Sequence, residues 1–231
     1  MVWVRKCFCG RESPVPRVLT DEDVTGFRDR LIETAERLFA ERGEDGVSMR
    51  LLATELGVSA MTPYRYFKDK DEILAAVRTR GFDAFAEALE KALASSPDPG
   101  VSSRRVGEAY ITFAVEHPAA YRLMFDLHQP TTYLHADLIR AGLRARKTMK
   151  AHVVMLYESG LVEGDLERLA HIFWAGLHGL VVLKMSGMLP PEMDFRSLAR
   201  EQYQALIRGF RPKPRHWVDD APPVAPQSEG A

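Results

Sequence analysis

The sequence predicts an all-α protein in which an N-terminal helix-turn-helix unit precedes a C-terminal helical domain. Hydrophobic residues recur at helical spacing along most of the chain, and the two-residue alternation of a strand does not occur. Two short helical segments joined by a glycine turn lie between residues 48 and 67. The 231 residues are 46% hydrophobic and 27% charged, which provides enough chain for a full hydrophobic core.

Composition and charge exclude several classes of protein. The 31 basic and 32 acidic residues leave a net charge of −1, so affinity for nucleic acid must come from local patches. Cys7 and Cys9 are too close together for a disulfide framework, which favours a reducing compartment. The longest apolar run, Leu169–Leu183, contains two histidines and is shorter than a membrane span. Because the first residues also lack the pattern of a secretory signal, we expect a cytoplasmic protein without membrane contacts.

The first 25 residues are predicted to be a disordered arm, since prolines, a glycine and an acidic run occur there without sustained periodicity. Order is expected to begin near Gly26. A first helix then follows from a single apolar stripe at i, i+4, i+8, i+11 and i+12, and Gly43 ends it. The stripe comprises Phe27, Leu31, Ala35, Leu38 and Phe39.

Two short helices complete the N-terminal unit, which is expected to extend over residues 26–72. Ser48 is placed to cap the second helix, and Gly57 permits the turn that follows it. Ser59 offers another capping oxygen, after which MTPYRYF can form two helical turns. In a helix-turn-helix motif, the second short helix enters the major groove of DNA.

The C-terminal domain is expected to span residues 73–210. Apolar residues at helical spacing continue from Asp71 for more than twenty residues, until SSPDPG, and predict a long connecting helix. Proline and glycine signals then separate the helices that follow. These are expected near residues 102–116, 118–126, 134–159, 165–187 and 194–210, before a disordered proline-rich tail over 211–231.

The helix-turn-helix segment contains candidate DNA-binding residues. A major groove about 12 Å wide accepts one helix, so residues in the first turns of the second short helix can reach base edges. An arginine in the preceding helix can bind guanine through two hydrogen bonds, while nearby hydroxyl and cationic groups bind phosphate. The same shape also occurs in proteins that bind no DNA. The candidates are Ser48, Arg50, Ser59, Ala60, Met61, Thr62, Tyr64, Tyr66 and Lys70.

Four short motifs occur at a fixed spacing within residues 27–77. They are LF-x-x-x-G from Leu38, GVS from Gly57, T-x-Y-x-x-F from Thr62 and K-x-x-x-L from Lys70. This segment closely resembles the TetR family of bacterial transcriptional regulators. HPAAYRLMF and FWAGLHGLV, further along the chain, resemble the ligand-binding half of a TetR subgroup. That subgroup is named for a Trp, a His and a Gly, which here would be Trp174, His178 and Gly179.

The resemblance implies a homodimeric repressor that binds a palindromic operator and is released by a small molecule in its C-terminal half. It assigns Arg50 to a base contact from the second helix and Tyr64, Tyr66 and Lys70 to phosphate. It also directs Ala60, Met61, Thr62 and Arg65 toward the groove. An activator remains an alternative, as does a relative that works through ligand or protein contacts without recognising an operator.

Two residues depart from the family pattern. Pro63 stands where the family usually has leucine, and a proline there removes a helical hydrogen bond and disfavours α geometry at Thr62. The first turn of the recognition helix is therefore expected to be loose or 3₁₀-like. Met61 occupies a position where a small residue or proline is common, so it can offer only an apolar contact. Base reading is then expected to depend on Arg50 and Arg65.

The apolar run Leu169–Leu183 predicts a dimer interface. A helix without a polar face must be covered on every side, and Ala175 and Gly179 would allow a second backbone to approach closely. The candidate interface consists of the helices near 165–187 and 194–210, as the resemblance also implies. A monomer that buries this helix internally is the alternative.

Candidate ligand-binding residues are the aromatic, methionine and histidine residues of the C-terminal half, and they suggest a hydrophobic effector of unknown identity. The same residue types often serve only to fill a core, and His178 can be a core histidine. The candidates are Phe85, Tyr110, Phe113, Tyr121, Met124, Phe125, Met155, Trp174 and His178.

We expect neither enzymatic activity nor a cofactor or metal. His171 and His178 are seven residues apart with Glu167 one turn earlier, but the spacing is not HExxH and a fourth ligand is missing. Cys7 and Cys9 form a CxC pair without a second pair. The basic start of the N-terminal arm can either lie along DNA or be an unstructured leader.

Overall fold

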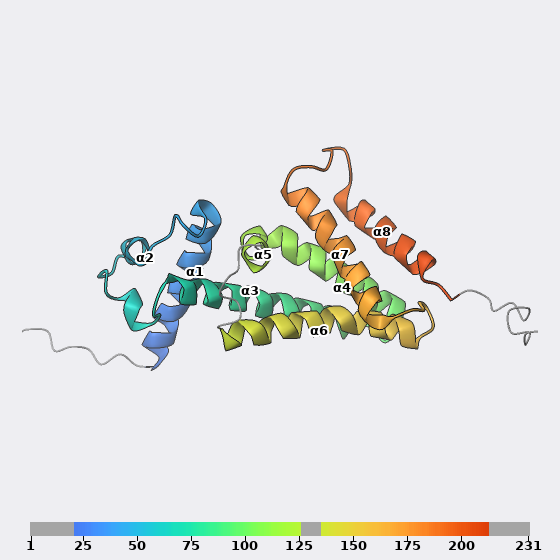
Figure 1. Cartoon of the computed structure of the whole chain (residues 1–231), viewed down its shortest axis with the longest axis horizontal. Helices are drawn as coiled ribbons and strands as arrows, with labels where there is room; N and C mark the ends of the chain where they lie inside the picture. Colours follow the sequence, from blue (N-terminus) through green and yellow to red (C-terminus); the bar gives the residue numbers. More distant parts are fainter. Residues whose placement is uncertain (1–20, 126–134, 213–231) are drawn as a thin grey trace, which may run out of the picture.

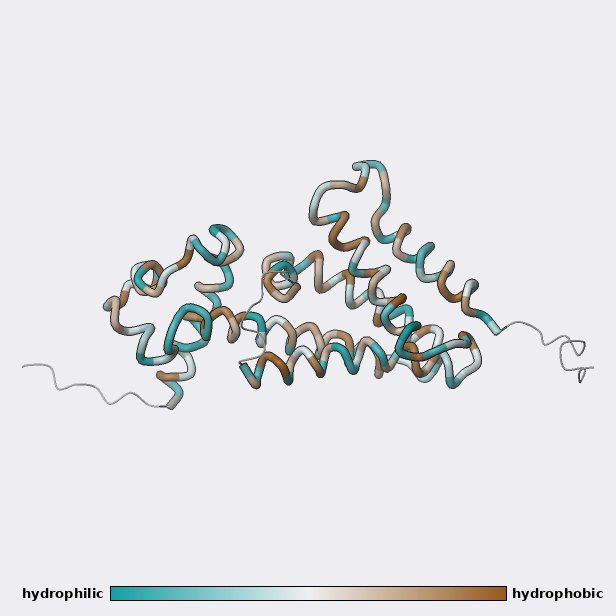
Figure 2. Tube along the Cα trace, viewed as in Figure 1, coloured by the Kyte–Doolittle hydropathy of each residue, from teal (hydrophilic) through white to brown (hydrophobic). Residues whose placement is uncertain are grey.

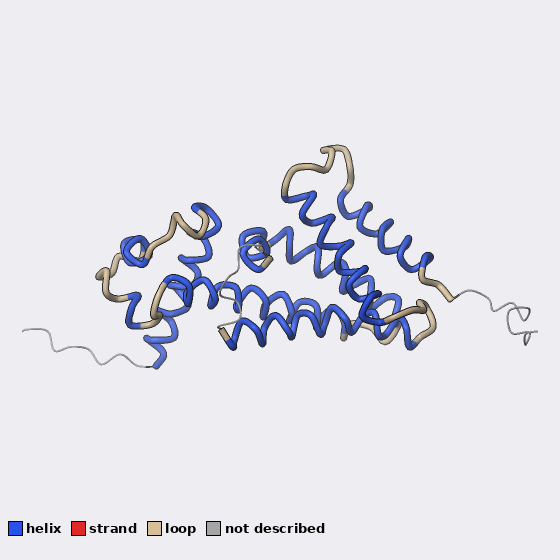
Figure 3. Tube along the Cα trace, viewed as in Figure 1, coloured by secondary structure: helices blue, strands red, loops and turns tan. Residues whose placement is uncertain are grey.

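The computed structural model describes residues 21–125 and 135–212, and every regular element in these ranges is helical (Figures 1 and 3). The all-α prediction is confirmed. The predicted arm up to residue 20 and the tail from residue 213 lie outside the described residues. The elements are α1 (Asp21–Arg42), α2 (Met49–Glu55), the 3₁₀ turn η1 (Pro63–Arg65), α3 (Lys70–Leu93), α4 (Pro99–Glu116), α5 (Pro118–Met124), α6 (Ala136–Glu158), α7 (Leu166–Met185) and α8 (Phe195–Gly209).

The molecule is elongated, with α1, α2 and η1 at one end and α7 and α8 toward the other (Figure 1). α3 connects the two ends: it packs on α1 near its start and on α4 and α6 along the rest of its length. Asp69 caps α3 by accepting a hydrogen bond from the Glu72 N–H (2.9 Å). The expected division between residues 72 and 73 therefore falls within the first turn of a continuous helix.

The N-terminal core is built on the predicted stripe of α1. Phe27, Leu31, Ala35, Leu38 and Phe39 are all buried there. α1 begins at Asp21, however, five residues before the expected start of order at Gly26. A glycine inside a helix costs only about 0.5 to 1 kcal/mol relative to alanine, which the rest of a long helix can offset.

The second short helix differs from the prediction of two helical turns. α2 is capped as expected, with Ser48 Oγ accepting from the Leu51 N–H (3.2 Å), and Gly57 adopts a positive φ of 66° in the turn. After that turn, only the 3₁₀ turn η1 forms. Pro63 has no N–H, so the first helical hydrogen bond cannot form. The expectation of a 3₁₀-like turn is confirmed, whereas Thr62 keeps α geometry (φ −65°, ψ −45°) although it precedes a proline.

The helices α4 to α8 begin and end within three residues of the positions predicted from the sequence. Their main core joins α3, α4, α5, α6, α7 and α8 around Phe85, Tyr110 and Tyr121. α5 also packs against α1, so this short helix belongs to both ends of the molecule.

His152 is a buried polar residue of α6. Its Nδ1 lies 3.0 Å from Ser103 Oγ, and its Nε2 has no hydrogen-bond partner within the described ranges. Burial lowers the pKa of His152 to about 4, because a charged ring would lose its hydration without gaining a counter-ion. The fold therefore requires a neutral imidazole at this position.

Acidification should weaken the fold through His152. Its pKa is about 4 when folded against 6.5 in the unfolded chain, so the unfolded chain binds the proton first. The stability that neutral His152 contributes is complete above pH 6.5 and is lost as the pH falls toward 4. The free energy of unfolding should therefore fall by about 2 kcal/mol by pH 5. Urea unfolding at pH 7 and pH 5 measures it. The His152→Gln variant should lose this part of the pH dependence, and the exposed-site control His171→Gln should keep it.

Candidate nucleic-acid interface and ligand site

The turn around η1 presents large side chains to solvent. Met61 is 67% exposed and Tyr64 is 49% exposed, while Pro63 between them is buried. Arg50, Ser59, Ala60 and Arg65 are also exposed, and Thr62 is half-buried. Within the described part of the chain, the side chains of Arg50 and Arg65 make no hydrogen bond or ion pair, so their N–H donors are available to a ligand.

The exposed turn is held by residues on both sides of it. Phe67 is buried in the N-terminal core, and the Arg28 guanidinium lies 4.2 Å from the centre of its ring. Arg28 also donates a hydrogen bond to the Tyr66 carbonyl (3.3 Å), and the Tyr66 ring lies 4.6 Å from that of Phe27. Arg28 was not among the predicted residues, since its partner Tyr66 is 38 residues away along the chain. Tyr66 is consequently half-buried and structural as well as a phosphate candidate.

Three other DNA-binding candidates have internal partners as well. Ser48 Oγ and Ser59 Oγ accept hydrogen bonds from the backbone N–H groups of Leu51 and Met61 (3.2 and 3.3 Å). Each hydroxyl still has its own proton to donate. Lys70 Nζ donates to the Glu44 carbonyl (3.0 Å), which leaves two of its three N–H donors for a phosphate.

Eight of the nine candidate ligand residues gather in one aromatic cluster, which we call the α5 cluster. Met155 is the exception, because it is half-buried on α6 outside this cluster. Five members are buried, and Phe125, Trp174 and His178 pack at the edge. The buried members are Phe85, Tyr110, Phe113, Tyr121 and Met124.

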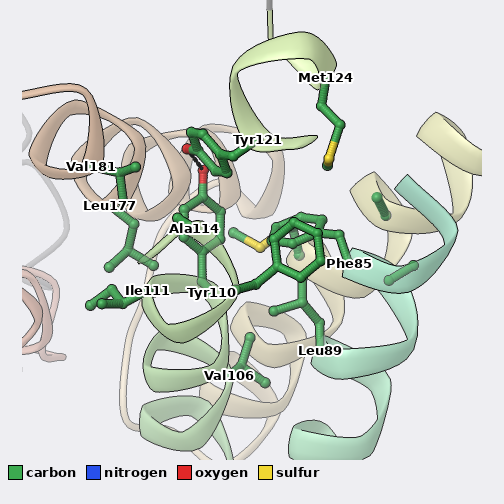
Figure 4. Packing of buried hydrophobic residues seen from close by; sticks show 14 of the residues in the cluster. Phe85, Leu89, Val106, Tyr110, Ile111, Ala114, Tyr121, Met124, Leu177 and Val181 are labelled. Carbon is green, nitrogen blue, oxygen red and sulfur yellow. Dashed lines mark hydrogen bonds between the residues drawn. The ribbon is translucent and has the colours of Figure 1, made fainter. Parts of the chain in front are cut away.

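A chain of hydrogen bonds crosses the α5 cluster. Trp174 Nε1 donates to the Tyr110 hydroxyl (3.2 Å), and the hydroxyls of Tyr110 and Tyr121 face one another at 2.7 Å (Figure 4). The Tyr121 hydroxyl lies 2.7 Å from His178 Nδ1. Burial raises the pKa of Tyr110 to about 12 and lowers the pKa of His178, so all four groups are uncharged at neutral pH.

A cavity of about 390 Å³ opens beside this chain, a volume within the usual range for small-molecule sites. Tyr121, Phe125 and His178 line it, whereas Phe85, Tyr110, Phe113 and Met124 are buried in the core and Trp174 lies at the edge, outside this cavity. Four further lining residues were not predicted from the sequence. Val182 and Met185 follow His178 by one and two helical turns and could have been found from that spacing. The missed residues are Arg122, Val182, Met185 and Ser186.

The residues weighed for a metal site do not come together. His171 Nδ1 lies 2.6 Å from the backbone carbonyl of Glu167, and the Glu167 carboxylate pairs with Lys150. Over residues 21–125 and 135–212, no group of three His, Cys, Asp or Glu side chains is placed to hold a metal. Cys7 and Cys9 lie outside the described residues.

α7 has an apolar face that its neighbours leave uncovered. It is the one described helix that is long and apolar enough to cross a membrane, although it packs on α4, α6 and α8. Only 28% of its most apolar window is buried, and Ile172, Val182 and Leu183 are each more than a third exposed. Hydrophobic residues near the C-terminal end of α7 are visible in Figure 2. Ala175 is exposed, and a Cβ added at Gly179 would meet nothing within 4 Å.

Comparisons with known proteins match both ends of the molecule. Residues 31–77 match the family described as bacterial regulatory proteins, tetR family, and residues 103–210 match the tetracyclin repressor-like C-terminal domain. An uncharacterized HTH-type transcriptional regulator of Mycobacterium tuberculosis is 24% identical over 189 residues, covering 82% of this chain and 84% of that regulator.

Two solved structures share the fold. A protein with unknown function from Rhodococcus sp. RHA1 is 26% identical, with a TM-score of 0.72, and the match covers 87% of this chain and 100% of that one. The TetR family transcriptional regulator PfmR from Thermus thermophilus is also 26% identical, with a TM-score of 0.62 and coverage of 78% and 98%. With its helix-turn-helix unit and its C-terminal domain both matched, the chain belongs to the TetR family and is a transcriptional regulator.

Proposed function

We propose that this regulator is a cytoplasmic homodimeric repressor that binds a palindromic operator and releases it when a small hydrophobic effector binds its C-terminal domain. The observation that carries the proposal is the surface around η1. Arg65 follows the exposed Tyr64 in η1, and Arg50 lies in α2, which packs against η1; both arginine side chains are exposed and unpaired within the described ranges.

Base recognition would depend on the two arginines. Each guanidinium has five N–H donors in a planar fork that matches the O6 and N7 acceptors of guanine. Ala60 and Met61 offer apolar contacts, such as to a thymine methyl. Ser48, Ser59, Thr62, Tyr64, Tyr66 and Lys70 would hold the phosphates that set the register.

Dimerisation would cover the outer face of α7. The exposed Ile172 and Ala175 and the half-buried Gly179 lie at i, i+3 and i+7 on this helix, which puts them on one stripe. α8 packs beside α7, where the Gln202 side chain lies against Gly176. The two helices would thus form one half of a symmetric interface.

α5 provides a physical route between effector and operator. Its Tyr121 and Met124, with Phe125 directly after it, belong to the α5 cluster, while Leu123 belongs to the N-terminal core. Arg78 of α3 donates a buried hydrogen bond to the Leu123 carbonyl (2.9 Å). A ligand that moves α5 must therefore disturb the packing of the helix-turn-helix unit. Such linkage is reciprocal and typically amounts to about 1 to 3 kcal/mol.

A regulator that acts through ligand or protein contacts without operator recognition is the second candidate. Pro63 favours it, because η1 is a single 3₁₀ turn where a longer recognition helix was expected. Fluorescence anisotropy against DNA flanking the gene and a scrambled control, at two salt concentrations, separates the two functions. A preference of about 10³-fold for the flanking DNA at the higher salt supports a site-specific regulator. Equal, salt-sensitive binding to both DNAs indicates a remote operator or degraded specificity, whereas binding to neither DNA supports the alternative.

Arg50→Ala should weaken operator binding by about 1 to 3 kcal/mol and relax specificity at one guanine. The loss follows from removing the guanidinium donors without disturbing packing, since the side chain is exposed. Arg208→Ala on α8 removes another exposed arginine at the other end of the molecule and should leave the affinity unchanged. Equal losses on operator and scrambled DNA would assign Arg50 to phosphate instead.

Ile172→Glu should convert a dimer into a monomer. A carboxylate in the centre of an apolar interface would be buried without a partner, which costs several kcal/mol. Light scattering should give twice the chain mass of 26.0 kDa for the wild type and the single mass for the variant. Val115→Glu is the matched control, because Val115 is 48% exposed on α4, away from this face. A wild-type protein at the single mass would refute the proposed interface.

A further inference from the structure

A second cavity lies in a groove between α4 and α8, with a volume of about 370 Å³. Its floor contains the buried side chains of Ile111, Leu177 and Ala199, so it can accept an apolar body. It shares no lining residue with the cavity beside His178. Leu177 and His178 are adjacent on α7, and they face different cavities.

Arginines dominate the polar lining of this groove. Arg104 and Arg105 come from α4, and Arg196 and Arg200 come from α8, whereas Glu108 is the one acidic lining residue. The local charge is therefore +3 at neutral pH. Such a concentration of one sign on facing helices is costly unless an anion or solvent screens it.

The guanidinium groups are largely uncompensated by the protein. Arg105 donates to the Ser95 carbonyl (2.7 Å), and Arg196 reaches the Thr112 hydroxyl at 3.4 Å, so both have neutral acceptors. Arg200 lies 3.7 Å from an exposed Asp194 carboxylate. Arg104 has no hydrogen bond or ion pair inside the described ranges.

The groove is placed apart from the DNA-binding end of the molecule, since α8 and η1 lie at opposite ends (Figure 1). One recognition surface cannot use both sets of arginines on the same DNA half-site. We propose that the groove between α4 and α8 binds an amphiphilic organic anion. Its carboxylate or phosphate pairs with the arginines, and its apolar body lies on Ile111, Leu177 and Ala199.

Charge and shape both favour this class of ligand. Arginine forks bind carboxylate and phosphate oxygens through paired, charge-assisted hydrogen bonds. The volume lies within the range of small-molecule sites, which combine apolar walls with a few polar groups. This ligand site does not depend on operator binding, so the two proposals can fail separately.

Calorimetric titration of the full chain with decanoate and decyl phosphate tests the proposal. Decanol probes the apolar part of the ligand alone, and inorganic phosphate probes the anionic head group alone. We expect one molecule of either amphiphilic anion per chain, and binding at least about tenfold weaker for decanol and for phosphate. The anion that binds with the lower Kd identifies the preferred head group. Binding of neither anion overturns the proposal, as does equal binding of decanol.

Variants locate the bound anion. The double variant Arg104→Ala and Arg200→Ala should raise the Kd at least about tenfold, because exposed donors are lost without a change in packing. Arg208→Ala is the matched control on the same helix as Arg200, and Arg122→Ala tests the cavity beside His178. Both should bind like the wild type. Loss of binding in Arg122→Ala alone would place the anion in the other cavity and overturn the proposal.

Gly107→Leu tests the apolar part of the groove without changing its charge. Gly107 lines the groove, and a Cβ there would lie 3.9 Å from Leu177 Cδ1, which is an ordinary contact. The longer side chain should fill the space and raise the Kd to a similar extent. Thermal unfolding of each variant checks that it is folded. Unchanged affinity in both groove variants would refute the site.

Discussion

The contact between α5 and α3 joins the two ends of the molecule. The Arg78 Nε donates to the Leu123 carbonyl at 2.9 Å in a buried position, and the Leu123 side chain completes the N-terminal core. One turn further along α3, a Cβ at Gly81 would lie only 2.9 Å from Met124 Sδ. Glycine therefore leaves room for the Met124 side chain against α3, and a larger residue would force that side chain to move.

The opposite face of α5 belongs to the core of the C-terminal domain, so this short helix packs on both sides. Tyr121 connects α5 to Tyr110 and to His178 through hydrogen bonds. Burial keeps the hydroxyl and imidazole groups that form these bonds uncharged. Buried polar groups are costly when they lose a partner, which gives this network a defined geometry. A ligand at the adjacent cavity must either keep these bonds or replace them. In both cases it acts on the helix that also holds the N-terminal core.

Sequence periodicity predicted which faces of each helix would be buried, and the stripe from Phe27 to Phe39 is an example. It did not predict which faces would meet. Arg28 and Tyr66 are 38 residues apart, and Arg78 and Leu123 are 45 apart, so nothing local signals either hydrogen bond. The arginines of the groove come from α4 and α8, and they were missed for the same reason. At Pro63, the missing N–H of one residue outweighed the capping signal at Ser59, from which two helical turns were predicted.

α7 shows why a helix of a regulator can have the composition of a membrane span. Phe173, Leu177 and Val181 point into the core, while Ile172, Ala175 and Val182 remain on the outer side. Because its inner side fills the core and its outer side also carries apolar residues, the charged residues of α7 are confined to its two ends. The same helix places Leu177 in the groove and His178 in the cavity. Because a helix moves largely as one body, a displacement at any of these surfaces is felt at the other two.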